Sequence, residues 1–373
     1  HIVFTPVYLS GSVISAFIYL LQQWSVISLN QYFVNISRTG FVMFVILDLF
    51  LALFFVIGDI NYFISKRSAK TSRPIDHSRR NFIYNFGLYF SLLPFISFLH
   101  GMFLGRYNFK LREITLHFEH LPEAFDQFVI VQISDFHAGS FDDRTKLKKG
   151  FELIQQANPD LLVFTGDMVN SSSLEAEPYI DDFKLLKATY GKYSILGNHD
   201  YYGSYKNNSN DLKSLAGIQD KMGFILLRNE QAVIRKGNTE INLIGVENWG
   251  RGPFPKKADL DQSTKHVSND DFNILLSHDP SHWEDHAKLH PIRFDLTLSG
   301  HTHGMQFGIE TPLFKWSPVQ YVYNKWAGLY TEEQQNLYVN RGFGYLWFAG
   351  RIGIWPEVTK ITLRRKSNDS AQN

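Results

Sequence analysis

The chain has 373 residues, which is enough for one large domain and a smaller region, since a domain usually holds roughly 100 to 200 residues. Its formal net charge of +1 argues against a protein that binds nucleic acid through a strongly basic surface, so we expect no nucleic-acid partner. The absence of cysteine excludes disulfides, thiolate metal sites and a catalytic thiol.

The first part of the chain is dominated by long apolar stretches. Residues 41–58 contain a single charged side chain, and their length matches the roughly 20 residues that a helix needs to cross a bilayer. Residues 2–21 and 82–104 are of similar length, although more polar side chains interrupt them. We therefore predict an all-α transmembrane region over residues 1–104, with spans at about 2–21, 41–58 and 82–104, in contact with membrane lipids.

The single charge in the strongest span is Asp48. It could belong to an ion or substrate pathway, because a charge at membrane depth is costly and is seldom idle. The alternative is that it faces a neighbouring helix and bonds to Ser, Asn or Tyr there, and this is favoured because the visible spans contain no cation to pair with it.

Because the chain begins at His1 rather than Met, we expect an expression remnant or an N-terminal truncation.

The connections between the apolar stretches differ in charge. The connection before the second span carries only Arg38, and the one after it carries six cations against two acidic residues, Asp59 at the end of the span and Asp76. Those cations are Lys66, Arg67, Lys70, Arg73, Arg79 and Arg80. The positive-inside rule therefore predicts that the second connection is cytoplasmic and that the soluble domain is extracytoplasmic, on the periplasmic or outer face of the membrane. Only about eight residues separate the third span from this domain, which favours a substrate in or near the membrane.

From about residue 113 the pattern changes to short β-type runs separated by helical stretches, which is typical of an α/β domain. We predict that this domain covers residues 113–365 and that residues 366–373 form a polar tail. The predicted strands are Phe128 to Ser134, Leu161 to Thr165, Tyr193 to Leu196, Ile241 to Val246, Phe272 to Ser277, Asp295 to Ser299 and Asn336 to Asn340.

Five of these strands end in residue types that bind metals. The clusters are Asp135-Phe136-His137, Gly166-Asp167, Gly197-Asn198-His199-Asp200, Ser277-His278-Asp279 and Gly300-His301-Thr302-His303. In α/β sheets the loops after several strands converge on one site, so five such clusters indicate a single centre. Imidazole and carboxylate ligands without sulfur suit Mn, Fe or Zn, and two such ions about 3.5 to 4 Å apart would activate water and clamp a phosphoryl group.

Any one of these clusters alone would be weak, because a lone His or a Gly-Asp turn is usually structural. Together they resemble the calcineurin-like metallophosphoesterase superfamily, whose D-x-H, G-D-x-x-D, G-N-H-D/E, H and G-H-x-H motifs occur in order from Asp135 to His303. The resemblance implies a four-layer α/β/β/α sandwich, two divalent metal ions and hydrolysis of a phosphate ester or pyrophosphate. The ending from Tyr338 to Gly344, followed by Arg351 and Pro356-Glu357, further resembles membrane-attached or exported bacterial members. Some of these are linked to cell-envelope substrates, so a lipid-linked phosphate is among the candidate substrates.

The resemblance also implies a role for each residue. The first ion would bind Asp135, His137 and His303, Asp167 would bridge, and the second would bind Asn198, His278 and His301. His199 would be the catalytic histidine, with Asp200 as its orienting partner. The sequence departs from the family pattern at Asn170, where the second Asp of G-D-x-x-D is usual. Because that residue commonly supports the site from outside the metal shell, we expect the departure to affect fine tuning rather than the metal pair.

Other polar residues receive weaker interpretations. Arg341 could donate to a substrate phosphate, with a structural salt bridge as the alternative. Trp249-Gly250-Arg251 could line a substrate cleft, but loop packing is favoured. Four further histidines match no motif and are interpreted as surface or loop residues: His266, His282, His286 and His290.

Two other classes of protein were weighed against the phosphoesterase. A non-catalytic membrane sensor or scaffold could retain the fold, but it would be expected to lack one or more metal ligands, and none is missing. A different metallohydrolase such as an amidohydrolase would be expected to carry a His-x-His pair on an early strand, whereas the pair here is the late His301 and His303.

Overall fold

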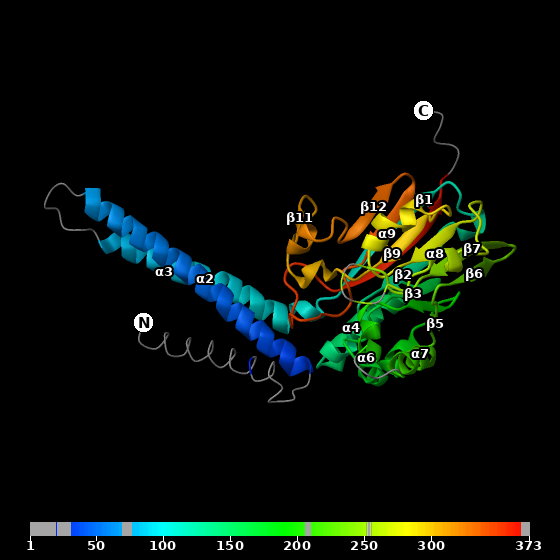
Figure 1. Ribbon diagram of the computed structural model, residues 1–373, viewed down its shortest axis with the longest axis horizontal. Helices are drawn as coiled ribbons and strands as arrows, with labels where there is room; N and C mark the ends of the chain where they lie inside the picture. The colour runs from blue at the N-terminus through cyan, green and yellow to red at the C-terminus, as the bar shows by residue number, and fades with distance from the viewer. Residues whose placement is uncertain are drawn as a thin grey trace, which may run out of the picture. The chain divides into compact units, whose positions relative to one another are not determined.

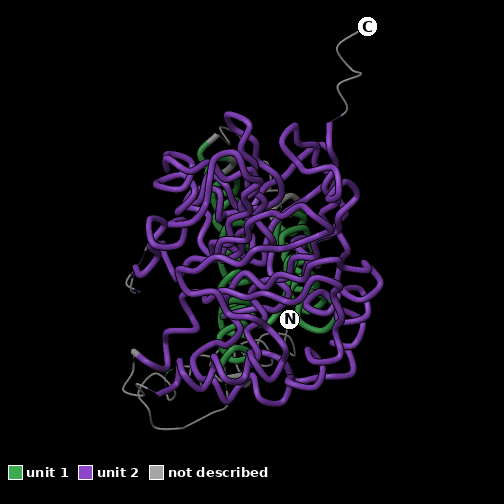
Figure 2. Tube along the Cα trace, turned by 90° about the vertical axis from the view of Figure 1, so that its right-hand side faces the viewer, with its two compact units in different colours: residues 1–104, 347–352 green, residues 105–346, 353–373 purple. Residues whose placement is uncertain are grey.

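The computed structural model describes residues 20, 31–68, 77–205, 210–250, 252, 254 and 256–366. The chain forms two compact units, which Figure 2 shows in different colours. Unit 1 comprises residues 1–104 and 347–352, and unit 2 comprises residues 105–346 and 353–373. Figure 1 labels many of their helices and strands.

Unit 1 contains two long apolar helices, α2 (Gln31–Ser68) and α3 (His77–Phe103). Both are long and apolar enough to cross a membrane. The predicted span at 41–58 falls inside α2, and the predicted span at 82–104 coincides with α3 as far as Phe103. The predicted span at 2–21 lies outside the described residues except for Leu20.

The two helices pack side by side through aromatic rings. Phe44 contacts Phe95 and Phe54 contacts Phe86, with ring centroids 6.2 and 5.7 Å apart, so the residue numbers run in opposite directions and the helices are antiparallel. Gly87 provides the space for Phe54, because a Cβ at this position would collide with that ring.

The first sheet of unit 2 is mixed and has the strand order β1-β14-β2-β3-β4-β5. All its neighbouring strands are parallel except β14 and β2, which are antiparallel. Its strands are β1 (Lys110–Phe118), β2 (Val129–Ile133), β3 (Leu161–Thr165), β4 (Lys192–Ile195), β5 (Ile225–Leu226) and β14 (Glu357–Arg365).

The second sheet is also mixed, with the order β12-β13-β9-β8-β7-β6. Its four central strands are parallel, and β12 and β6 run antiparallel at the two edges. Its strands are β6 (Glu230–Lys236), β7 (Thr239–Gly245), β8 (Asn273–Leu276), β9 (Leu296–Ser299), β12 (Gly328–Glu332) and β13 (Gln335–Val339). A separate hairpin is formed by β10 (Ile309–Glu310) and β11 (Lys315–Trp316).

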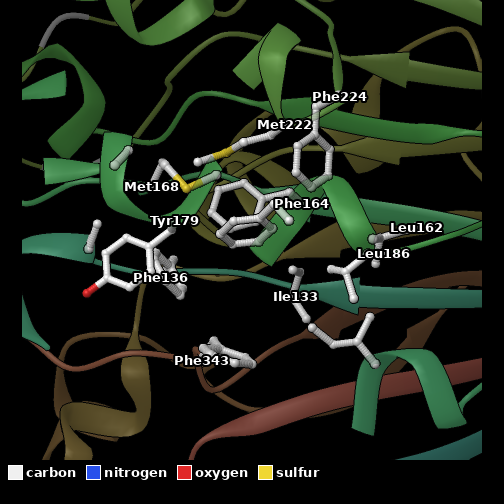
Figure 3. Close-up of a cluster of buried hydrophobic side chains, with 14 of the residues drawn as sticks. Ile133, Phe136, Leu162, Phe164, Met168, Tyr179, Leu186, Met222, Phe224 and Phe343 are labelled. Carbon is white, nitrogen blue, oxygen red and sulfur yellow. The ribbon is translucent and has the colours of Figure 1, made fainter. Parts of the chain in front are cut away.

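Three buried apolar clusters define the layers of unit 2. The middle cluster contains Ile130 and Val163 of the first sheet with Leu276 and Leu298 of the second, so the sheets face each other. Alternate residues of the first sheet point the other way, into the cluster of Figure 3, where Phe164 packs with Phe183 and Phe224. The helices on this side are α4 (Arg144–Gln156), α5 (Ile180–Leu185), α6 (Tyr202–Tyr205) and α7 (Asp211–Lys221).

The second sheet is covered on its outer face by a smaller cluster. Ile244 and Leu275 pack there against Trp283 of α9 (Ser281–Asp285) and Leu260 of α8 (Leu260–Ser263). The order helix, sheet, sheet, helix confirms the predicted α/β fold with two mixed sheets.

The structure contains all seven predicted strands, with shifts of one or two residues at their ends. It adds strands that the sequence analysis missed, the longest being β1 and β14. β1 is an edge strand with a largely exposed, charged surface, so its alternation is weak. It pairs with β14 from the far end of the chain, a contact that local patterns do not reveal.

Candidate metal centre

The predicted metal ligands lie after five strands of the two facing sheets. Within each sheet these strands run parallel, so their carboxyl ends meet at one edge. Hydrogen bonds then join the two edges. His278 Nδ1 lies 2.7 Å from the main-chain oxygen of Thr165, and the main-chain N–H of His301 donates to Asp135 at 2.9 Å. The sandwich therefore brings side chains far apart in sequence into one centre.

The first group of possible ligands contains Asp135, His137 and His303, all of them buried. The Nε2 atoms of the two histidines lie 3.0 Å apart, and His303 Nε2 lies 3.2 Å from Asp135 Oδ1. One candidate ligand atom from each residue lies within 4.8 Å of the others, so a single ion could contact all three.

The second group contains Asp167, His278 and His301. His278 Nε2 lies 3.2 Å from Asp167 Oδ2 and 3.2 Å from His301 Nδ1. Asp167 Oδ2 is also 3.6 Å from His137 Nε2 in the first group. The same carboxylate oxygen therefore faces both groups.

The donor set fits divalent ions. Ligand atoms about 2.0 to 2.2 Å from a shared ion lie about 3 Å from one another, which is the spacing of the ring nitrogens and carboxylate oxygens in both groups. The side-chain oxygen of Asn198 is buried and has no hydrogen-bond partner in the described part of the chain. An orphaned buried amide oxygen is costly, and a cation would satisfy it.

The backbone at the centre is unusual. Five of the predicted ligands have positive φ angles, which non-glycine residues seldom adopt. They are Asp135 (54°), His137 (49°), Asp167 (60°), His301 (70°) and His303 (51°). A residue in the left-handed conformation directs its side chain away from the path of the preceding strand. Because five such residues occur at one centre, we infer that the fold constrains the conformation of the ligands.

Packing below the centre maintains these conformations. Phe136 separates two predicted ligands and is buried in the cluster of Figure 3, where its ring lies 5.0 Å from those of Tyr179 and Phe183. Glycine is required at two of the motifs because the chains approach closely. A Cβ at Gly197 would collide with the Asp167 carboxylate, and one at Gly300 would collide with Ser134 and Asp135.

The electrostatic environment keeps the carboxylates ionised. Burial alone would raise the pKa of Asp135, but the adjacent His303 lowers it below its usual range. Asp167 behaves in the same way, because His278 and His199 outweigh its burial and lower its pKa. Burial lowers the pKa of His137 well below 6.5, so this imidazole is neutral. Ionised carboxylates and a neutral imidazole are the forms that coordinate a metal.

His278 shows the opposite balance. Burial lowers the pKa of its imidazole, but Asp167 and a hydrogen bond to it raise the value to about 10. Without a cation, this histidine therefore holds a proton beside Asp167. A metal would have to displace that proton, because only the neutral ring coordinates.

His199 lies beside the two groups. Its main-chain N–H donates to Asp167 Oδ1 at 2.8 Å, and its ring is 5.1 Å from that of His137. Its Nδ1 lies 2.8 Å from the main-chain oxygen of Asn170, which therefore orients the imidazole. The ring is half-buried.

The structure differs from the sequence interpretation at Asp200, which was expected to orient His199. Both carboxylate oxygens of Asp200 instead accept main-chain N–H groups from Asp167, Met168, Val169 and Gly197. Burial, and then the charge of Asp167, raises the pKa of this carboxyl to about 7. Asp200 therefore organises the turn that carries Asp167, because its side chain is directed into that loop.

Other predicted residues lie outside the two groups. Arg341 is buried and bonds at 2.6 Å to both Glu357 and Glu310, which is the salt-bridge alternative. His266 and His286 are exposed and His290 is half-buried, but His282 is buried and its Nδ1 lies 2.8 Å from Ser277 Oγ. The surface interpretation was therefore wrong for His282. Trp249 follows β7 and packs against the rings of His282 and His286.

The sequence analysis gave no role to two residues at the centre. The Tyr323 hydroxyl lies 2.8 Å from His301 Nε2, and an Asp279 carboxylate oxygen lies 3.4 Å from the same nitrogen. Asp279 belongs to the predicted Ser277-His278-Asp279 cluster, although no role was given to it. Tyr323 belongs to no motif, and only the fold of residues 303–326 brings it to His301.

Comparison with known proteins gives the same class of enzyme. Residues 128–305 match the family model of the calcineurin-like phosphoesterases, and residues 2–106 match that of a probable calcineurin-like phosphoesterase transmembrane domain. An uncharacterised metallophosphoesterase of Bacillus subtilis, YkuE, is 30% identical over 271 residues, which are 71% of this chain and 89% of that protein.

Of two further relatives, one is named as uncharacterised and the other is named as an enzyme with a stated substrate. An uncharacterised metallophosphoesterase of Helicobacter pylori is 28% identical over 349 residues, covering 91% of this chain and 84% of its own. The UDP-2,3-diacylglucosamine pyrophosphatase LpxG of Chlamydia trachomatis is 29% identical over 286 residues, covering 61% and 81% respectively.

The sandwich and its two His/Asp groups define a metal-dependent hydrolase of phosphoester bonds. The chain belongs to the calcineurin-like metallophosphoesterase family. It is a membrane member of that family, with an N-terminal transmembrane domain and two helices able to span a bilayer.

Proposed function

We propose that this protein hydrolyses a phosphate ester or pyrophosphate with two divalent ions. Asp135, His137 and His303 would hold the first ion, and Asn198, His278 and His301 the second, with Asp167 between them. The observation that carries this proposal is the position of Asp167 Oδ2, which lies 3.6 Å from His137 Nε2 and 3.2 Å from His278 Nε2. One carboxylate oxygen facing two groups of ligands is the arrangement that a bridging role needs.

The ions would supply Lewis acidity at phosphorus and lower the pKa of the attacking water. His199 would complete the chemistry. Because Asn170 accepts from its Nδ1, its Nε2 is the nitrogen that can serve the substrate, and when the ring carries a second proton there this N–H could stabilise charge on a phosphoryl oxygen or protonate the leaving oxygen. Asp167 fixes the backbone of His199 through a 2.8 Å hydrogen bond, so the bridging carboxylate and the catalytic ring are held in one unit.

The substrate is proposed to be lipid-linked or part of the cell envelope. The transmembrane domain supports this, because it confines the enzyme to a membrane surface. A relative, LpxG, is named as a pyrophosphatase of a diacylated UDP-sugar.

We propose that residues 1–104 form the anchor and residues 113–365 the catalytic domain. The charge bias of the connections favours an extracytoplasmic location for this domain.

A hydrolysis screen that identifies the phosphate-containing products, carried out with the purified protein, tests this function. Samples loaded separately with Mn, Fe and Zn would be offered phospholipids, lipid-linked nucleotide sugars, isoprenoid pyrophosphates and small soluble phosphodiesters. We expect metal-dependent hydrolysis of a lipid-linked phosphate ester or pyrophosphate, and loss of that activity in Asp167→Ala. Turnover of the soluble compounds alone would contradict the lipid-linked substrate, and metal-independent turnover would contradict the proposed chemistry.

A further inference from the structure

The surface of unit 2 has one concentration of apolar side chains. Among the described residues of this unit, twelve large apolar side chains are exposed, and eight of them lie between residues 305 and 329. The other four are scattered: Leu174, Leu185, Ile225 and Leu289. We call the following seven residues the apolar edge: Met305, Phe307, Ile309, Leu313, Phe314, Tyr321 and Val322.

In the first part of the apolar edge, apolar side chains point outward and the residues between them are buried. Met305, Phe307 and Ile309 are 51%, 38% and 53% exposed, whereas the intervening Gln306 and Gly308 are buried. Gln306 is held inward by the main-chain N–H of Leu346, which donates to its side-chain oxygen at 2.6 Å. The local backbone therefore places three apolar side chains outside while the polar Gln306 is held within unit 2.

The β10–β11 hairpin extends this surface. At its tip Leu313 is 99% exposed and Phe314 is 55% exposed. The turn is ordered by Thr311, whose N–H donates to the Phe314 oxygen at 2.8 Å and whose hydroxyl accepts from the Phe314 N–H at 3.0 Å. A hydrogen-bonded turn therefore presents a large apolar side chain fully to its surroundings.

The charges next to the tip are directed away from this surface. Between residues 304 and 322 the sequence contains only two charged side chains, Glu310 and Lys315. Glu310 accepts from Arg112 and Arg341 at 2.6 Å, and Lys315 donates to the main-chain oxygen of Ala327. Glu310 is therefore neutralised by two arginines, and the Lys315 ammonium is hydrogen-bonded within unit 2, so both charged groups are engaged inside this unit.

A short connection joins unit 2 to the transmembrane domain. Residues 2–106 match a transmembrane domain, α3 ends at Phe103, and β1 begins at Lys110. The six intervening residues can extend about 20 Å, so unit 2 stays close to the membrane. Apolar and aromatic side chains that lack nearby charges are the composition that enters the boundary between headgroups and acyl chains.

We propose that the apolar edge docks onto the lipid bilayer, with Leu313 and Phe314 inserted at the boundary between headgroups and acyl chains. The edge begins two residues after His303, and its member Val322 precedes Tyr323, which bonds to His301. Docking therefore brings the bilayer beside the candidate metal centre. The consequence that an acyl chain of the substrate lies along the edge rests on the proposed function, whereas the docking itself does not.

A fluorescent label tests the docking without any assay of activity. The chain has no cysteine, so Leu313→Cys gives a single site for an environment-sensitive fluorophore in the full-length protein. Leu185→Cys and Leu289→Cys are matched controls, because each of these leucines is 74% exposed in the same unit. Leu313 is almost fully exposed and its replacement should not disturb folding, and Phe314→Cys provides a second label at the tip.

The labelled proteins would be reconstituted into phosphatidylcholine–phosphatidylglycerol vesicles with and without lipids that carry a quencher in the acyl chain. We expect the quencher lipids to cause a loss of fluorescence at positions 313 and 314 but not at 185 or 289. Equal quenching at all four positions, or none at the tip, would overturn the proposal. A spectral shift at the tip that depends on protein concentration and not on quencher lipids would instead indicate that a second copy covers the edge.

Discussion

Nδ1 of His199 lies 2.8 Å from the main-chain oxygen of Asn170. The N–H of the same peptide unit belongs to Ser171, and it donates to Glu175 Oε1 at 3.2 Å. Glu175 Oε2 also accepts the N–H of Asn170 at 2.6 Å. A half-buried carboxylate therefore holds the peptide that orients the candidate catalytic histidine and the peptide before it, and its charge polarises the carbonyl toward the imidazole.

Replacing Glu175 by Gln should lower kcat without removing metal. The amide retains the shape but loses the charge, and its NH2 group would face one of the two N–H donors that the carboxylate now accepts. We expect a fall of about 10-fold in kcat with little change in KM, a size typical of residues outside the ligand shell. Steady-state kinetics and metal analysis measure this. Glu177→Gln is the matched control because Glu177 is nearby and exposed. Loss of metal from Glu175→Gln, or an equal effect in the control, would refute the positioning role.

Metal binding and catalysis should separate between Asp167 and His199. Asp167→Ala should lose at least one ion, because its carboxylate oxygen faces both groups of ligands. His199→Ala should retain both ions but lose roughly 10² or more in turnover, the scale of removing a general acid or a transition-state donor. Metal analysis and turnover on the purified variants provide the measurement. A metal-free or fully active His199→Ala protein is the result that would exclude this assignment.

Asn170→Asp should restore the family residue with a modest effect. The Asn170 side chain contacts Ser140 at 3.0 Å, while its main-chain oxygen, which the substitution retains, contacts His199. We therefore expect unchanged metal content and a change in turnover within the range of about 10- to 100-fold that outer-shell substitutions produce. Metal stoichiometry decides the matter, since an altered number of ions would mean that this position reaches the metals directly.

The side of the membrane can be tested with two single cysteines. Leu289→Cys places a thiol on the exposed surface of the catalytic unit, and Ser78→Cys places one in the first turn of α3, before the candidate span. If the domain is extracytoplasmic, an impermeant thiol reagent should label the first variant in intact cells, with outer-membrane permeabilisation where needed, and the second only after lysis. The reverse pattern would place the catalytic unit in the cytoplasm.

The sequence determined the fold class and the candidate site because their signals are local. Each ligand cluster directly follows a short apolar strand, and the order of the five motifs identifies the family without knowledge of distances. The apolar stretches at 41–58 and 82–104, which fall in the two helices able to cross a membrane, were recognisable for the same reason, since hydropathy depends on consecutive residues.

Only the tertiary structure decided which partner each side chain has. Asp200 is next to His199 in the sequence, yet its carboxylate accepts N–H groups from the turn of Asp167, and Asn170 orients the histidine instead. Tyr323 reaches His301, and Glu310 pairs with Arg341, for the same reason. Adjacency along a chain does not determine direction in space. Sheet register and loop conformation fix these contacts, and they arise from packing between segments that are distant in the sequence.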